Sequence, residues 1–161
     1  MTTRLAAFFA AAFVLLSAAT PHAQTAKAPV PVDISANEME ILDAENKAVF
    51  KGAVDATRGT TRLQSDTLTV IYAEVKQPDG SMKTDATDLD ARGNVTIKTP
   101  RETITGDWAK FNPQTNKLVV GGAVKLVQGA TVLTGNELRA DLNTDKIQMM
   151  GGRVKGSFLP D

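Results

Sequence analysis

An internal repeat runs through most of the chain, and it limits the possible folds more than any other feature of the sequence. Its first landmark contains a small residue followed by Asn or Asp, here called a small–Asx pair. An apolar residue lies three positions before the Asn or Asp. This landmark occurs at spacings of 29, 41 and 29 residues: Ile34 before Asn37, Leu63 before Asp66, Ile104 before Asp107, and Leu133 before Asn136. The second landmark is a glycine followed two or three residues later by valine, at spacings of 41, 29 and 29: Gly52/Val54, Gly93/Val95, Gly122/Val124 and Gly151/Val154. Both landmarks fit one period of 29 residues with a single 12-residue insertion near residues 73–84.

Each repeat predicts two strands joined by a turn. After the Asx residue, apolar side chains occupy every second position, as in Leu68, Val70 and Tyr72, and the positions between them are mostly polar. This period of two is typical of a strand with one solvated face. Residues 43–46, 112–116 and 143–145 are rich in turn-forming residues. No segment after residue 30 has a sustained helical period, so the sequence predicts an all-β, antiparallel fold with few or no helices.

The small–Asx pairs predict a bend in each strand. The apolar residues on either side of each pair lie five positions apart, as in Leu63 and Leu68, which would place them on opposite faces of a flat strand. A bulge or corner returns both to the same face. We therefore interpret Asn37, Asp66, Asp107 and Asn136 as corners, the alternative being a ligand or calcium site. Four corners in register would fold the sheet into two walls, as a jelly-roll or half-open sandwich.

The N-terminal segment has the features of a secretory signal. Arg4 precedes an uncharged, mostly apolar run of 15 residues, Leu5–Ala19, which is too short to span a membrane. We expect residues 1–23 to be a signal peptide, residues 24–31 a flexible leader, and residues 32–161 a single β domain. Cleavage near Ala19 or Ala26, or retention of the segment as a membrane anchor, are the alternatives. Secretion of a cysteine-free chain favours the periplasm of a bacterium with two membranes.

The composition argues against several classes of function. The chain has no cysteine and a single histidine, His22, which lies within the expected signal peptide. Thiol nucleophiles, imidazole triads and zinc clusters therefore have no residues to form them. The 18 basic residues balance 18 acidic ones, which gives no charge excess for nucleic acid. Acidic residues are plentiful, but nothing isolates two of them in a cleft as glycoside hydrolysis requires. We expect a protein that is not an enzyme, with no cofactor, no metal and no nucleic-acid partner.

Several segments resemble one known family. The signal-like N-terminus, Ile-Ser-Ala-Asn-Glu-Met at 34–39, Val-Phe-Lys-Gly-Ala-Val at 49–54, Thr134-Gly135-Asn136 and the four-fold repeat are similar to the OstA-like lipopolysaccharide-transport family. The resemblance covers about residues 32–155. It implies a twisted β-jellyroll with open ends that binds lipid A. It also implies two partners with similar domains, an inner-membrane anchored export component and an outer-membrane lipopolysaccharide assembly protein.

The inward-facing apolar residues would form the lipid-binding trough of such a fold. Each CH₂ group of an acyl chain removed from water contributes ~0.8 kcal/mol. The alternative is a closed core, in a generic exported β-sandwich module that binds carbohydrate or acts in a surface assembly. The expected lipid-binding residues are Met39, Ile41, Phe50, Val54, Leu68, Val70, Phe111, Val120, Val124, Leu138 and Met149.

Two further expectations concern surfaces. A repeat that does not close leaves an unpaired strand at each end, within Val32–Ile41 and within Ile147–Phe158. These edges predict head-to-tail association of copies into rods of variable length. Trp108 is out of phase with Ala109 and Phe111, so we expect it to face outward, either over a hydrophobic rim or toward a partner.

Overall fold

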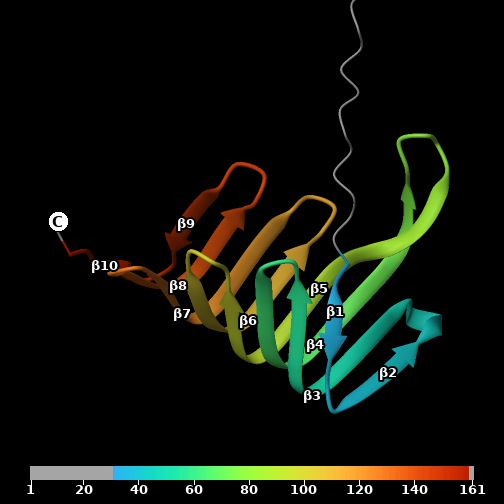
Figure 1. The fold of residues 1–161 in the computed structure, drawn as a ribbon, viewed down its shortest axis with the longest axis horizontal. Coiled ribbons are helices and arrows are strands. Elements are labelled where there is room, and N and C mark those ends of the chain that lie inside the picture. The colour runs from blue at the N-terminus through green and yellow to red at the C-terminus, as the bar shows by residue number, and fades with distance from the viewer. Residues whose placement is uncertain (1–30, 160–161) are drawn as a thin grey trace, which may run out of the picture.

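The computed structural model describes residues 31–159, and these form one antiparallel sheet of ten strands (Figure 1). The expected signal peptide and most of the expected leader lie outside the described residues. The strands are β1 (Asp33–Ser35), β2 (Glu38–Leu42), β3 (Lys47–Arg58), β4 (Thr61–Lys76), β5 (Met82–Lys98), β6 (Thr103–Asn112), β7 (Lys117–Gln128), β8 (Thr131–Asp141), β9 (Lys146–Met150) and β10 (Lys155–Ser157). A single 3₁₀ turn, η1 (Asp43–Glu45), is the only helical element among these residues. The all-β prediction is confirmed.

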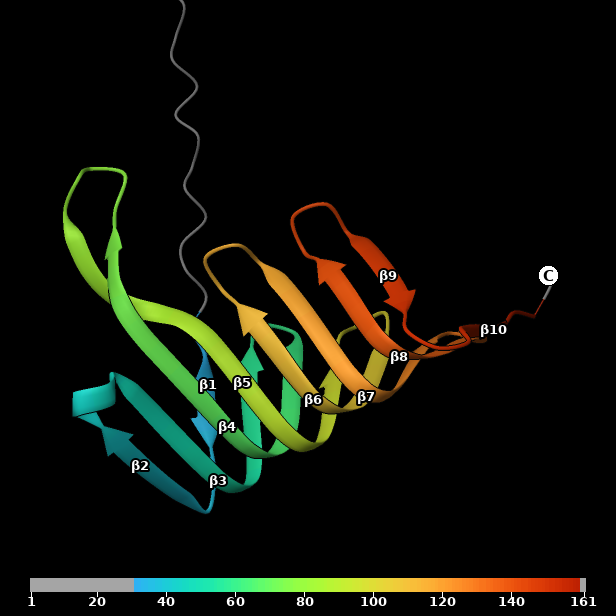
Figure 2. The same ribbon diagram turned by 180° about the vertical axis from the view of Figure 1, so that it is seen from behind.

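The long strands β3 to β8 bend near their middle, so the sheet folds into two walls joined along one side. Wall A contains β2, β9 and the halves of the long strands that lie between them, and wall B contains β1, β10 and the other halves. The bends lie along the lower side of the molecule and the connecting turns rise along its upper side (Figures 1 and 2). The result is a twisted trough that is open along the top and at both ends, as expected for an open β-jellyroll.

The bends coincide with the two landmarks of the repeat. The strand register shifts at each of them, as between Lys51 and Val54 where β3 meets β4. The extra residue of each bulge lies in the glycine-bearing strands β3, β5 and β7, opposite the Asx residue of their neighbours. Gly93 has a φ of 78°, and a Cβ there would clash with the side chain of Asp66. The corner interpretation is therefore confirmed, because each small–Asx pair packs against the glycine of the following strand.

The 12-residue insertion forms a hairpin that rises above the other turns (Figure 1). Strand β4 continues to Lys76 and β5 begins at Met82, so both strands extend beyond the level of their neighbours. The turn at 77–81 is closed by a hydrogen bond from the Gly80 amide to the Gln77 carbonyl, at 2.9 Å. The tip of the hairpin thus contains Pro78, Asp79 and Gly80, residue types that favour turns.

The hydrophobic core lies at the closed side of the trough, between the two walls. Leu68, Val120 and Leu138 on wall A are fully buried, as are Val54, Val95 and Val124 on wall B. The six are the inward residues nearest to the bends, where the walls converge. Among residues 31–159, no helix has the length and apolar character needed to cross a membrane.

Candidate functional site

The space between the walls contains two adjoining cavities with volumes of about 150 and about 390 Å³. Both are lined by Thr61, Ile97, Leu118 and Leu142, so they are parts of one groove. Ile97 and Thr61 lie on wall B, and Leu118 and Leu142 lie on wall A or in its last turn. The two walls therefore face each other across this groove with mostly apolar side chains.

The groove lies on the open side of the trough, above the core. Its lining residues come from the outer thirds of the long strands and from the turns, such as Arg58 and the segment 99–102. The groove rests directly on the core, because several of its lining residues are themselves buried core residues: Ala56, Ile97, Ile104, Leu118 and Ala140. Arg58, farther from the bend on the inward row of β3, lines the groove at its rim. Buried core residues thus form the base of the groove, and residues near the turns form its rim.

The structure divides the eleven expected lipid-binding residues into three groups. Val54, Leu68, Val70, Val120, Val124 and Leu138 are buried in the core, and Phe50 and Met149 pack against that core in a partly buried state. Phe111 lines the groove. Met39 and Ile41, on the edge strand β2, are 56% and 61% exposed. Phe111 is therefore the only one of the eleven that lines either cavity.

Most residues that line the groove were not among the expected site residues. The apolar ones are Val32, Ala56, Leu63, Leu89, Ile97, Ile104, Leu118, Ala140, Leu142 and Ile147. Most of them follow the same alternation as the expected residues. The signal that would have found them is their place in each strand, because inward residues near a turn lie where the walls have separated.

The mouth of the groove carries two arginines. Arg58 lines the smaller cavity and Arg101 the larger one, where Glu102, Asp141 and Asp145 also contribute. Within the part of the chain that the structure describes, neither guanidinium group forms an ion pair. The groove thus combines a mostly apolar interior with charged groups of both signs at its rim, two arginines and three carboxylates.

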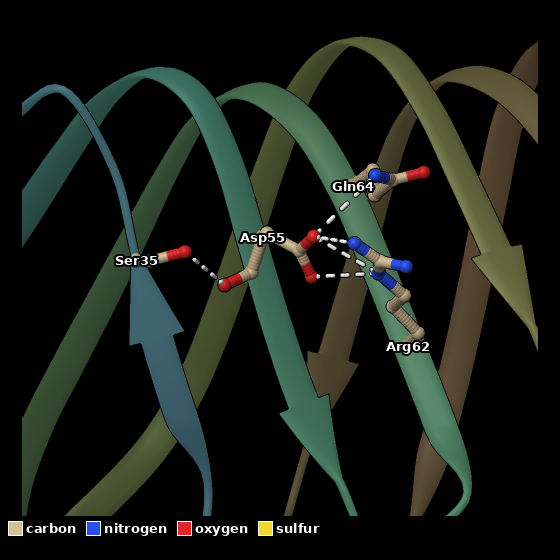
Figure 3. A network of polar contacts seen from close by, with 4 residues as sticks. All are labelled: Ser35, Asp55, Arg62 and Gln64. Carbon is tan, nitrogen blue, oxygen red and sulfur yellow. Dashed lines mark hydrogen bonds and ion pairs between the residues drawn. The ribbon is translucent and has the colours of Figure 1, made fainter.

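The outer faces of the walls carry the paired charges. On wall B, Arg62 donates two hydrogen bonds from Nε to the carboxylate of Asp55, both at 2.9 Å, and Gln64 donates to the same carboxylate (Figure 3). These bonds from Arg62 lower the pKa of Asp55. The hydroxyl of Ser35 donates to the Asp55 backbone carbonyl at 3.5 Å and so links β1 to β3. On wall A, Trp108 faces outward as expected, with the Arg92 guanidinium carbon 5.8 Å from its ring centroid.

Each end of the trough has unpaired strand edges. Strands β1 and β2 pair only with β3, and β9 and β10 pair only with β8. The edge segments also expose large apolar side chains: Val32, Met39, Ile41, Ile147, Val154, Phe158 and Leu159. Unpaired backbone groups together with exposed apolar side chains are typical of surfaces that add further strands.

Comparisons with known proteins find a family model, a sequence relative and a solved structure that are similar to this chain. Residues 33–146 match the family model described as LptA/(LptD N-terminal domain) LPS transport protein. An uncharacterized protein of Rhizobium meliloti (strain 1021) is 33% identical over 137 residues, which cover 81% of this chain and 72% of that protein. The crystal structure of LptH from Pseudomonas aeruginosa, described as the LptA homologous periplasmic component of the conserved lipopolysaccharide transport device, is similar in fold. Its TM-score is 0.71 at 16% identity, and the match covers 81% of this chain and 96% of LptH.

Proposed function

The chain belongs to the LptA/LptD N-terminal domain family of lipopolysaccharide transport proteins, and from this premise we propose that it binds lipopolysaccharide in its groove and bridges the two membranes. The acyl chains of lipid A lie between the walls, and copies joined end to end carry the lipid across the periplasm. The members of this family are transport proteins rather than enzymes. The observation that carries the proposal is the open apolar groove, whose two ends are unpaired sheet edges.

The groove suits acyl chains in size and chemistry. An apolar cavity of about 150 Å³ is large enough to hold a benzene molecule, and the larger cavity shares four lining residues with it. Since each buried CH₂ contributes ~0.8 kcal/mol, even part of one acyl chain gives substantial binding energy. The open side leaves the sugar and phosphate groups in water, and Arg58 and Arg101 lie where phosphates would emerge.

The repeat itself specifies how two copies would join. Strands that bend at a small–Asx pair (Asx strands) alternate along the sheet with strands that bend at a glycine (glycine strands). The first edge of the sheet is an Asx strand and the last edge is a glycine strand. In each internal pair of glycine strand and following Asx strand, the residue before the glycine pairs with the residue after the Asx: Lys51 with Thr67, Arg92 with Trp108, and Gly121 with Glu137. The same rule at the junction pairs Met150 with Glu38 of the next copy.

This register brings the exposed apolar residues of the two edges together. On wall A, Met149 meets Met39 and Ile147 meets Ile41 of the next copy, as Phe50 meets Leu68 and Ala48 meets Val70 within one chain. On wall B, Gly156 meets Ile34 and Phe158 meets Val32. The groove then continues from one copy into the next. A related domain anchored in either membrane can take the place of a copy at each end by the same strand addition.

Photo-crosslinking tests lipid binding in the groove. A photoreactive residue at Phe111 or Leu142 should capture lipopolysaccharide, whereas one at Glu40 or Lys110, on the outer face, should not. Deacylated lipopolysaccharide should fail to compete, because the acyl chains supply the binding energy. Equal capture at both sets of positions would contradict the groove, and competition by the deacylated glycan would favour a carbohydrate-binding module instead.

Sedimentation of the purified protein tests the bridge. We expect oligomers of increasing length as the concentration rises, because a head-to-tail contact does not close. The variant Ile41→Asp places a charge in the apolar part of the junction and should give monomers with unchanged circular dichroism. Glu40→Asp, on the opposite face of the same strand, is the matched control. A wild-type protein that stays monomeric and binds no related membrane domain would contradict the bridge.

A further inference from the structure

The hairpin formed by residues 72–86 extends wall A beyond the rim of the groove. Its two strands are the continuations of β4 and β5, and they pair from Tyr72 with Ala86 to Lys76 with Met82. No other described strand lies beside this part of the hairpin, because β3 pairs with β4 only as far as Ile71 and β6 pairs with β5 only from Leu89. The hairpin is thus a free-standing addition to one side of the groove.

One face of the hairpin continues the inner face of the wall. A register shift between Ile71 and Tyr72 leaves Thr87 as an extra residue in β5. As a result, Tyr72 and Ala86 form the next pair on the same face as Val70 and Leu89. Ala86 packs against the core, which places this pair on the groove side. By alternation, Met82 and Lys76 lie on the same face, whereas Ala73 and Val75 lie on the outer face.

Hydrogen bonds at its base hold the hairpin upright. The backbone amide of Tyr72 donates to the carbonyl of Asn46 in the preceding turn of wall A, at 2.8 Å. On the other side, Nε2 of Gln114 donates to the carbonyl of Ala86 at 3.0 Å. At the tip, the amide and hydroxyl of Ser81 both donate to Asp79. The hairpin is therefore fixed to the turns on both sides, as a rigid wall extension would be.

The inner face of the hairpin is mostly apolar at its base and carries both charged and apolar side chains above it. Tyr72 and Ala86 at its base are partly or wholly apolar, and Tyr72 is 36% exposed. Glu74 lies one level higher, opposite Thr84, and Lys76 pairs with Met82 at the top, where Met82 is 56% exposed. Such a surface matches an amphiphile whose acyl chains fill the groove and whose polar part lies at the mouth.

We propose that this hairpin is a lip of the groove that covers the carried glycolipid where it leaves the space between the walls. The inference rests on the proposed function, and it assigns Tyr72 and Met82 as contacts to the lipid at the mouth. The occupant of the inner face is the glycolipid because this face is continuous with the groove wall at Leu89, which lines the smaller cavity. The lip retains a lipid that is already bound, so deleting the lip should raise the dissociation rate of the lipid.

Photoreactive residues on the two faces of the hairpin test the lip. Probes at Tyr72 and Met82 should capture lipopolysaccharide, and probes at Ala73 and Val75 on the same strands should not. A probe at Phe111 inside the groove serves as the reference. Capture at Phe111 with none at Tyr72 and Met82 overturns the lip and leaves the proposed function standing. Failure at Phe111 overturns the proposed function and the lip with it. Capture of a protein in place of lipid at Tyr72 also overturns the lip.

A deletion supplies the second test, and the repeat specifies its design. Removing residues 73–84 leaves six residues between Val70 and Leu89, the same number that separates the paired residues Phe111 and Leu118. The shortened chain therefore has a turn length that this fold already uses, and circular dichroism should show an intact sheet. We expect lipopolysaccharide to dissociate about tenfold faster. As a control, the variant Val75→Thr changes only the outer face. An unchanged dissociation rate in the folded deletion variant overturns the lip.

Discussion

The indole ring of Trp108 lies over Gly121, its cross-strand partner on the outer face of wall A. A Cβ at position 121 would overlap the ring. The absence of a side chain on β7 thus creates the place for the largest side chain on β6. Trp108 therefore covers its own sheet, with the Arg92 guanidinium over the ring, and its contact with a partner stays a prediction.

Replacing this glycine should displace the tryptophan. In the variant Gly121→Val, the ring must leave its position or the strands must separate, and we expect a loss of about 1–3 kcal/mol in the free energy of unfolding. Trp108 is the only tryptophan of the chain, so its fluorescence should shift to the red as the ring enters water. Lys110→Val, on the same outer face, should leave the emission unchanged. Unaltered fluorescence in Gly121→Val would show that the ring does not depend on this contact.

The expected lipid-binding residues should separate into two classes when truncated. Leu68 is fully buried, so Leu68→Ala should lower the free energy of unfolding by about 2–5 kcal/mol through lost contacts and a cavity. Ile41 is 61% exposed on the free edge, so Ile41→Ala should change monomer stability by less than about 1 kcal/mol. Urea denaturation at a concentration that keeps the protein monomeric measures both. Similar losses for the two variants would contradict the placement of the core at the bends.

The sequence predicts the fold well because the same pattern of strands and bends occurs in each of the four repeats. Alternation defines the strands, and the Asx and glycine landmarks define the bends. It predicts the lining of the groove less well, because alternation shows which face a residue occupies and not how far apart the walls are at that height. Leu68 and Leu63 carry the same pattern, yet Leu68 is in the core and Leu63 lines the groove. The sequence also did not show which face of the inserted hairpin points toward the groove, because this depends on the extra residue Thr87, which is visible only in the strand register.

Engineered cysteines should report the register of the junction. The chain has no cysteine of its own, so the double variant Ile147→Cys with Ile41→Cys can form disulfides only through the new residues. These two positions lie at opposite ends of the sheet, and the proposed register makes them cross-strand partners between copies. Mild oxidation should yield covalent ladders on a denaturing gel.

The control for this register is a slip by one residue. Pairing Ile147→Cys with Glu40→Cys places the two thiols on opposite faces of the sheet, and ladders should be absent. Ladders of equal intensity from both double variants would indicate that the copies join without a fixed register.

The ion pair of Asp55 and Arg62 should stabilise the protein in a pH-dependent manner. The hydrogen bonds from Arg62 hold the pKa of Asp55 below its ordinary value. The contribution is therefore present at pH values above the ordinary range of an aspartate, about 4, and is lost as the pH falls through the lowered pKa. We expect Arg62→Gln to melt slightly earlier than wild type at pH 7 and at the same temperature as wild type under strongly acidic conditions. A difference that grows on acidification would contradict this assignment.

The two arginines at the mouth should act on the anionic part of the lipid. Arg58→Gln and Arg101→Gln should each weaken lipopolysaccharide binding about two- to fivefold at low salt. The difference from wild type should shrink in high salt because exposed charges are screened. Arg62→Gln removes the same charge from the outer face and should leave binding unchanged. If all three variants bind alike, these groups do not contact the phosphates.

The walls of the trough meet along one side only, and this has a consequence for cargo size. A closed tunnel acts as a sieve, since the widest part of a molecule must pass through the bore. A trough grips the narrow tails and leaves the head outside, so its dimensions place no upper bound on the bulk of that head. A molecule with a single sugar and one with a long polymer attached would occupy the same volume between the strands. Under the proposed function, the fold would therefore select a lipid by its acyl chains and set no limit on the size of the attached sugars.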